Sequence, residues 1–361
     1  MVIDEKLMVI DVQKKPPQGG EKNKKLMFKI FGNITTNRPP VWLMRQAGRV
    51  LPRYRKLRET YSFRELMETP QLAADVTLMP VDDLGVDAAI IFSDILTVPT
   101  ALGMQIEWTD HGPKFPQPLC NVENPSKFLK IQPEKFEHVY KAIDIVVKGK
   151  KVPLIGFCGA PMTTLCYMIQ GVSGKQNFPD AKKFFYQNRT ETQKLLEIIT
   201  EISIEYALKQ IEHGIEIFQI FESNAGLVPT DFYEELMLPS VKKIANAVRS
   251  KGVPVIFFPK GIGCGLRLAT PDFCDFVSVD WQTNILDARK LVHPEVGLQG
   301  NFDPHLLFAP QERIAAEVEK YRKFFAENPN WIANLGHGVL AETPIENVDF
   351  FIQKLKELQI N

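Results

Sequence analysis

The most regular feature of the chain is a series of short apolar segments separated by longer segments with helical periodicity. The apolar segments are rich in β-branched or aromatic residues and are apolar on both faces, which is typical of strands in a parallel sheet covered by helices. There are eight of them, starting near residues 41, 88, 152, 216, 254, 276, 296 and 331.

Helical patterns occupy most of the intervening chain. They are expected at residues 25–31, 63–80, 136–148, 181–213, 230–251, 286–292, 311–326 and 344–357. Thr230 or Asp231 is the predicted N-cap of the helix over 230–251, and Pro239 is expected to break or kink it. The segment 102–118 is rich in turn residues and is expected to be an excursion from the core.

Eight βα units over roughly 330 residues predict an α/β protein with a single (β/α)₈ TIM barrel, its active site at the carboxyl ends of the strands. A doubly wound sheet would have a glycine-rich turn after its first strand. None is present there, and Gly261–Gly265 lacks the G-x-G-x-x-G frame. The expected division is a flexible extension over residues 1–25 and a barrel over residues 26–361.

Composition narrows the class of partner. The 361 residues include 43 basic and 43 acidic side chains, so the formal net charge is zero. This balance argues against nucleic-acid binding and against electrostatic binding to membranes. The sequence has no apolar run long enough to span a bilayer and no signal-peptide pattern. The 5 cysteines show no C-x-x-C spacing, which favours free thiols in a reducing, cytoplasmic compartment.

The candidate chemistry lies at the predicted strand ends. Arg45 and Arg49 are four residues apart after the first strand, and on a helical turn this spacing would place both guanidinium groups on one face. Each can bind a carboxylate through two hydrogen bonds, which predicts a polyanionic substrate. The other polar residues at or just beyond strand ends are Asp94, Cys158, Tyr167, Ser223, Asn224, Lys260, Asp280, Asn301, Asp303 and His337.

Each of these residues also has an ordinary structural explanation. A strand-end aspartate is often a helix N-cap, Tyr167 fits a core position, and Lys260 could pair with Asp280. His337 lies between two glycines, which is an unusual place for a core histidine and favours a functional role. No metal-binding spacing is present, and nothing around Ser223 resembles a nucleophile elbow.

Several stretches together resemble the uroporphyrinogen decarboxylase family. The first is Pro40–Arg49, continued by Leu51-Pro52 and Tyr54-Arg55. The others are Ile91–Leu96, Gly156–Pro161, Phe221–Gly226, Leu298–Pro304 and Asn334–Gly338. The resemblance runs from about residue 25 to the end of the chain.

This resemblance implies a barrel that forms a homodimer and decarboxylates the four acetate side chains of uroporphyrinogen III, giving coproporphyrinogen III for haem synthesis. It implies neither a metal nor an organic cofactor. It places Asp94 at the pyrrole nitrogens and Arg45 as the proton donor. The substrate-binding positions that it implies are Arg45, Arg49, Asp94, Phe157, Tyr167, Ser223 and His337.

Some positions depart from the family pattern, namely Met162–Thr164, Cys158, Ala341 and the 262–264 loop. Two alternatives stay open. One is a zinc methyltransferase on the same barrel, although the 262–264 loop has no histidine to pair with Cys264. The other is a barrel that only binds tetrapyrroles, against which the acidic Asp94 argues, because a simple anion binder has no use for an acid among its cations.

Overall fold

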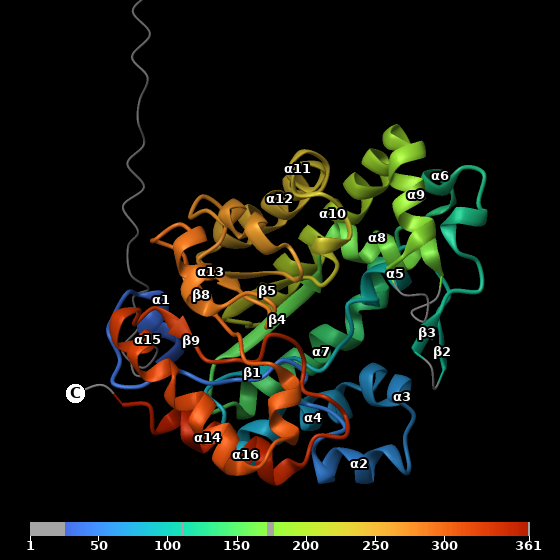
Figure 1. Cartoon of the computed structure of the whole chain (residues 1–361). Coiled ribbons are helices and arrows are strands. Elements are labelled where there is room, and N and C mark those ends of the chain that lie inside the picture. The colour runs from blue at the N-terminus through green and yellow to red at the C-terminus, as the bar shows by residue number, and fades with distance from the viewer. Residues whose placement is uncertain (1–25, 110–111, 172–176, 360–361) are drawn as a thin grey trace, which may run out of the picture.

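A curled, seven-stranded parallel sheet forms the centre of the molecule (Figure 1). The computed structural model describes residues 26–109, 112–171 and 177–359. The strands pair in the order β1-β4-β5-β6-β7-β8-β9. Their bounds are β1 Ala89–Ile90, β4 Leu154–Gly159, β5 Ile217–Glu222, β6 Val255–Pro259, β7 Phe276–Ser278, β8 Gly297–Gln299 and β9 Trp331–Ile332. Each begins within three residues of a predicted strand.

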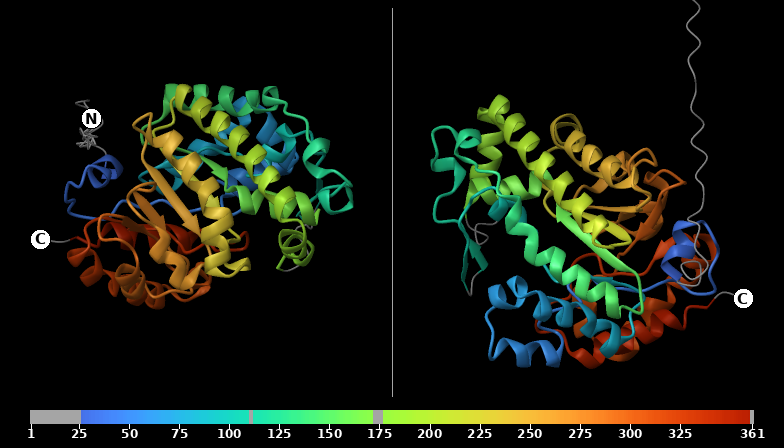
Figure 2. Two further views of the ribbon diagram at one scale, coloured as in Figure 1. Left: turned by 90° about the horizontal axis from the view of Figure 1, so that it is seen from above. Right: turned by 180° about the vertical axis from the view of Figure 1, so that it is seen from behind.

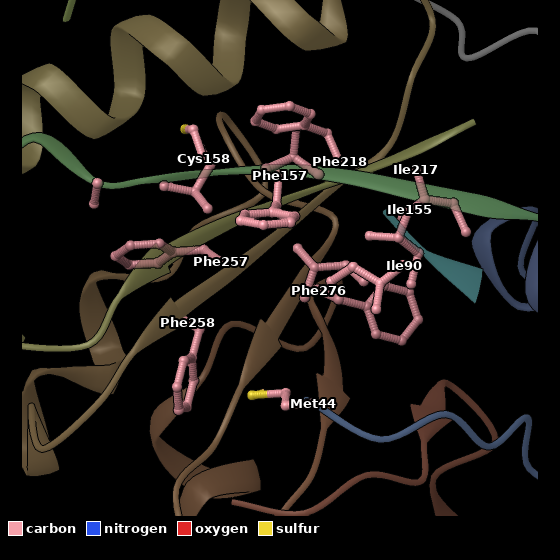
Figure 3. Close-up of a cluster of buried hydrophobic side chains, with 14 of the residues drawn as sticks. Met44, Ile90, Ile155, Phe157, Cys158, Ile217, Phe218, Phe257, Phe258 and Phe276 are labelled. Atoms are coloured by element: carbon pink, nitrogen blue, oxygen red, sulfur yellow. The ribbon is translucent and has the colours of Figure 1, made fainter. Parts of the chain in front are cut away.

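The strands are buried on both faces, as their composition predicted. Alternate side chains along β4 point to opposite sides, so that Phe157 lies inside the curl while Cys158 points outward to the helices (Figure 3). Gln210, on helix α10 (Arg189–Glu212), donates to the carbonyl oxygen of Phe157 and accepts from its N–H, at 3.1 and 3.2 Å. The neighbouring Gly156 is needed here, because a Cβ at that position would lie 2.5 Å from the Gln210 Oε1.

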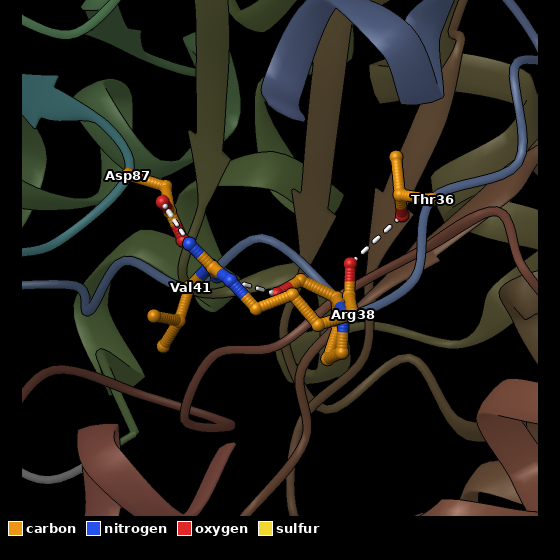
Figure 4. Close-up of polar contacts among 5 residues, drawn as sticks. Thr36, Arg38, Val41 and Asp87 are labelled. Carbon is orange, nitrogen blue, oxygen red and sulfur yellow. Dashed lines mark hydrogen bonds and ion pairs between the residues drawn. The ribbon is translucent and has the colours of Figure 1, made fainter. Parts of the chain in front are cut away.

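The strand predicted near residue 41 is reduced to a single bridge, in which Val41 pairs with Ala333 in parallel. Its other neighbour is Asp87, which binds Val41 through both its backbone and its side chain (Figure 4). The Asp87 carboxylate also forms a two-point ion pair with Arg38, at 2.7 and 2.8 Å. The prolines at 39 and 40 have no N–H to donate to a sheet, which explains why regular pairing starts no earlier.

Helices lie on the outer side of the curled sheet (Figure 1, Figure 2). Those that follow the predicted pattern are α1 Leu26–Phe31, α3 Phe63–Glu68, α4 Pro70–Leu84, α7 Glu137–Gly149, α9 Pro179–Gln187, α10 Arg189–Glu212, α12 Leu238–Arg249, α13 Ile285–Leu291, α14 Gln311–Glu319, α15 Tyr321–Glu327 and α16 Ile345–Lys356. Additional α-helical segments are α2 Pro52–Arg58, α5 Thr97–Ala101, α6 Pro125–Phe128 and α8 Pro161–Gln170. The first turn of the helix predicted over 230–251 is α11 Thr230–Phe232. Short 3₁₀ turns cover Leu119–Asn121, Pro133–Phe136, Ala225–Leu227, Gly263–Leu268 and Pro304–Phe308.

Predicted helices that contain a proline are divided in the structure. The pattern over 63–80 breaks at Thr69, because Pro70 begins a new helix. The helix over 230–251 contains a π-helical turn, η5 Tyr233–Met237, just before Pro239. Its predicted N-cap is wrong: Pro229 is the N-cap residue, and Thr230 and Asp231 are already helical.

The segment 102–118 leaves the core as predicted. Within it, β2 Glu107–Thr109 and β3 Gly112–Lys114 pair antiparallel as a separate ribbon. The predicted extension over residues 1–25 lies outside the described residues. No helix among the described residues has both the length and the apolarity to cross a membrane.

Candidate functional site

A cleft of about 1300 Å³ opens at the carboxyl ends of the strands. Small-molecule sites are generally of about 300–1,000 Å³, so this cleft can hold a larger ligand. Six of the seven substrate-binding residues predicted from the sequence line it, namely Arg45, Arg49, Asp94, Phe157, Ser223 and His337.

The inner wall of the cleft is made of phenyl rings at the ends of neighbouring strands. Phe157 on β4 meets Phe221 on β5 edge to face at 5.4 Å, and Phe221 meets Phe258 on β6 in the same way at 6.2 Å. Figure 3 shows Phe157 and Phe258 on the inner side of the sheet together with Met44. These rings give the cleft an apolar wall suited to a flat or bowl-shaped organic ligand.

Arg45 lies in a turn and not in a helix, so the predicted helical spacing of the two arginines is wrong. Its φ of +61° is in the left-handed region. The turn is held on one side by Asn334, whose Oδ1 accepts from the N–H of Met44 at 3.0 Å. On the other side Gly338 packs against the arginine stem, where an added Cβ would lie 2.3 Å from the Arg45 Cδ. Arg45 and Arg49 nevertheless line the same cleft.

Asp94 follows β1 and belongs to the turn that leads into α5. Its Oδ1 accepts from the N–H of Leu96 at 2.8 Å, and its own carbonyl oxygen accepts from Thr97. Burial raises the pKa of the Asp94 carboxyl, and the hydrogen bond from Leu96 and the positive charge of Arg45 oppose this rise. The Asp94 carboxyl therefore lies close enough to Arg45, in the same cleft, to be affected by its positive charge.

His337 is enclosed by aromatic rings and faces two cations. Its ring centroid lies 6.5 Å from that of Phe258 and 6.1 Å from that of Trp281. Burial, together with the positive charges of Arg45 and Lys260, lowers the pKa of His337 to about 3. The imidazole is therefore neutral at physiological pH and can donate one hydrogen bond and accept another.

Ser223 lines the cleft directly after β5, whereas Tyr167, on α8, is not among the residues that line it. Burial raises the pKa of the Tyr167 phenol. The nearby charge of Asp94 raises this pKa further, and the charge of Arg45 lowers it. Tyr167 also packs edge to face on Phe178 at 5.0 Å, so it is partly a packing residue.

The remaining strand-end residues have structural roles. Asp280 accepts from the backbone N–H groups of Gly261 and Gln282, and no described ion pair joins it to Lys260. Lys260 instead lies over the ring of Trp281, at 5.8 Å. Of the other members of the set, Asp303 caps the turn at His305, Asn301 binds Tyr321 and two backbone carbonyls, and Cys158 is buried. The backbone N–H of Asn224 donates to the Thr163 hydroxyl at 3.2 Å.

Comparison with known proteins identifies the family. The family model for uroporphyrinogen decarboxylase (URO-D) matches residues 22–358. The chain belongs to the uroporphyrinogen decarboxylase family. A uroporphyrinogen decarboxylase from Trichlorobacter lovleyi is 42% identical over 326 residues, which cover 89% of this chain and 95% of the relative. One from Christiangramia forsetii is 37% identical, with 92% and 98% covered.

Solved structures show the same fold at lower identity. A methyltransferase from Methanosarcina mazei superposes with a TM-score of 0.68 at 19% identity, covering 91% of this chain and 96% of that one. A B12-independent methionine synthase from Shewanella gives 0.53 at 13% identity, covering 80% and 85%. These likenesses concern the fold alone. In the part of the chain that the structure describes, no three His, Cys, Asp or Glu residues are grouped as metal ligands.

The cleft of this uroporphyrinogen decarboxylase family member has further lining residues that sequence reasoning missed. The cations are Arg58 and Arg64, and the aromatic residues are Tyr54, Phe63, Phe92, Trp108, Phe221 and Phe258. Phe221 and Phe258 could have been found from their places at the ends of predicted strands. Phe92 follows β1 inside a predicted strand and could have been found in the same way. The others come from α2, α3 and the β2-β3 ribbon, and no local pattern indicates that these elements fold over the open end of the sheet.

The departures from the family pattern fall in three places, one of which is the 262–264 loop, where the 3₁₀ turn Gly263–Leu268 begins. Ala341 lines the cleft itself. Met162, Thr163 and Cys158 are buried behind the wall between β4 and α8.

Proposed function

We propose that this chain is a uroporphyrinogen decarboxylase, which converts the four acetate side chains of uroporphyrinogen III to methyl groups and yields coproporphyrinogen III. The observation that carries this proposal is the placement of Asp94, Arg45 and Arg49 in one aromatic-walled cleft. The match to the family over nearly the whole chain supports the same reaction.

The chemical problem is to find a place for the electron pair of the broken C–C bond. Protonation of the pyrrole carbon beside the acetate makes the ring an iminium-like cation. When carbon dioxide leaves, the electron pair neutralises that cation and forms an exocyclic methylene group. A second proton at the methylene carbon, with loss of the first ring proton, gives the methyl group, so each acetate takes up one proton net.

Asp94 suits the stabilisation of the ring cation. A carboxylate at the inner end of the cleft can accept hydrogen bonds from several pyrrole N–H groups and attract the positive ring. Burial raises the pKa of Asp94 in the protein alone, and pyrrole N–H donors together with Arg45 favour its ionised form. Binding of the substrate would therefore favour the ionised form of Asp94, which is the form that stabilises the ring cation.

The other residues suit the carboxylate groups of the substrate. Arg45 and Arg49 are exposed within the cleft, where their guanidinium groups can each bind an acetate or propionate. Ser223, neutral His337 and Tyr167 are proposed as hydrogen-bonding partners for further carboxylates, and Phe157 as a packing surface for the macrocycle. By family resemblance Arg45 is the proposed proton donor, although a guanidinium is a weak acid with a pKa above about 12.

The test is anaerobic incubation of the purified protein with uroporphyrinogen III, followed by separation of products by their number of carboxyl groups. Stepwise appearance of products with seven, six, five and four carboxyls is expected. Binding of the tetrapyrrole without any loss of carboxyl groups would favour the non-catalytic barrel instead. Metal analysis of the same preparation tests the zinc alternative and the proposed absence of a cofactor.

We propose further that the segment around Val41 closes the sheet into an eight-stranded (β/α)₈ barrel. In support, Ala333 beside β9 donates to Pro40 at 2.9 Å, and Asp87 ahead of β1 donates to Val41 at 2.7 Å. Slow hydrogen exchange at both amides is expected, and rapid exchange at either would show an open edge.

The proposed assembly is a homodimer in the cytoplasm. The homodimer rests on the family resemblance, and the location on five cysteines that are all free thiols. Sedimentation at micromolar concentration is expected to give twice the chain mass, and localisation of a tagged chain by cell fractionation tests the compartment. A single-chain mass, or recovery outside the cytoplasm, would overturn the respective proposal.

A further inference from the structure

Glu222 is a fully buried carboxyl at the last position of β5, directly before Ser223. It is not among the residues that line the cleft. A carboxyl group loses much of its hydration free energy when it is buried, so its place here has to be explained by the contacts that it makes.

Those contacts join three elements. The hydroxyl of Thr163, in the first turn of α8, donates to one carboxyl oxygen of Glu222. The same hydroxyl oxygen accepts from the backbone N–H of Asn224 at 3.2 Å. The other carboxyl oxygen accepts from the hydroxyl of Tyr233 in the π-helical turn, at 3.3 Å.

The junction links two residues assigned to the substrate. Tyr167 follows Thr163 by one helical turn, and residues four apart in a helix lie on the same face. Ser223 lies between Glu222 and Asn224, which both bind the Thr163 hydroxyl. The distance between Tyr167 and Ser223 is therefore set through the buried carboxyl of Glu222 and the hydroxyl of Thr163.

Among the residues that the structure describes, no cation contributes to the pKa shift of Glu222. The titratable groups that face it are Cys158 from β4, Cys166 from α8 and Tyr233 from the π-helical turn, and burial raises the pKa of each. None of the ion pairs found among the described residues includes Glu222. Burial raises the pKa of Glu222 to about 7, with the hydrogen bonds from Thr163 and Tyr233 opposing the rise.

We propose that Glu222 is a positioning residue which, through Thr163, holds Ser223 and Tyr167 at the separation needed to bind substrate carboxylates between them. The inference rests on the proposed function for the identity of the ligand. Ionisation places an uncompensated charge inside this junction and draws water toward it, so the junction loosens as the pH rises through neutrality.

The experiment measures kcat and KM for uroporphyrinogen III between pH 5.5 and 8.5 in Glu222→Gln, Thr163→Val and Thr163→Ser. The matched control is Glu216→Gln, the same change on the same sheet at the opposite end, where Glu216 pairs with Lys150. Strands rise about 3.3 Å per residue, which places the control about 20 Å from Glu222. A second readout is the Kd for the unreactive, oxidised uroporphyrin.

Thr163→Val is expected to raise KM and Kd about tenfold, because it removes one hydrogen bond to the Glu222 carboxyl group. Its kcat should change by less than about threefold, and Thr163→Ser should restore most of the binding. Wild type and Glu216→Gln should show KM rising above pH 7, whereas Glu222→Gln should show a flat profile. A purely structural role would lower the amount of active enzyme and leave KM and its pH dependence unchanged.

Unchanged KM and Kd in Thr163→Val, or the same rise of KM above pH 7 in Glu222→Gln as in wild type, would overturn the proposal. If the wild-type chain binds uroporphyrin but removes no carboxyl groups, the proposed function fails, and the Kd series still decides the role of Glu222. If wild type neither binds uroporphyrin nor removes carboxyl groups from uroporphyrinogen III, both proposals are refuted.

Discussion

Gly338→Ala is expected to damage the active site by moving Arg45, although residue 338 presents no functional group of its own. An alanine Cβ at 338 would lie 2.3 Å from the Arg45 Cδ, 2.5 Å from its Cγ and 3.0 Å from its Cβ. Carbon atoms in contact are about 3.5 Å or more apart, so the stem has to move by about 1.2 Å. The clash involves the near end of the side chain, which cannot swing away as its tip could.

A displacement of about 1 Å at a catalytic group costs about 10²-fold in rate, which corresponds to about 2.7 kcal/mol of transition-state stabilisation. We therefore expect kcat/KM for uroporphyrinogen III to fall about 10²-fold in Gly338→Ala. The matched control is Gly149→Ala at the end of α7, where an added Cβ meets no atom within 4 Å. Circular dichroism and the melting temperature show whether both variants remain folded.

A double-mutant cycle with Arg45→Ala isolates the cause. If the added methyl group acts through the arginine stem, Gly338→Ala should cost far less in the Arg45→Ala background than in wild type. Equal costs in both backgrounds would show that residue 338 acts by another route. A folded Gly338→Ala protein with wild-type kcat/KM would refute the steric reasoning altogether.

Three further outcomes are expected. Asp94→Asn should keep the fold, measured by circular dichroism, and lose most turnover, because a neutral amide cannot stabilise the ring cation; unchanged turnover would remove the basis of the mechanism. Asp87→Ala should lower the free energy of unfolding in urea by about 3 kcal/mol, because it leaves the half-buried Arg38 and the N–H of Val41 without their partner; a loss below about 1 kcal/mol would contradict this. Glu222 keeps its proton between about pH 4.5 and pH 7 in the folded chain but not in the unfolded one, so raising the pH through this range favours unfolding. The free energy of unfolding of wild type should fall by about 3 kcal/mol more than that of Glu222→Gln between pH 5 and pH 8, and parallel pH profiles would contradict the assignment.

The site was only partly predictable, because some of its residues lie at strand ends and others come from elements that cover the end of the sheet. Asp94 and Ser223 were found because they lie at or just beyond the ends of apolar strands, and the ends of parallel strands meet at one edge of the sheet. Phe157 was found only through the family resemblance. Arg58, Arg64 and Trp108 were missed because they line the cleft from α2, α3 and the separate ribbon. Nothing in their own segments shows that these elements fold over the mouth of the sheet.

The amino-acid sequence by itself determined the parallel sheet, the order of strands and helices, and the family. These follow from local periodicity and from motifs that can be read along the chain. Only the tertiary structure decided that Arg45 lies in a left-handed turn against Gly338, and that the buried Glu222 accepts a hydrogen bond from Thr163 of α8. Such relations join segments that are far apart in the sequence, and they exist only when close packing has fixed which side chains exclude water from one another.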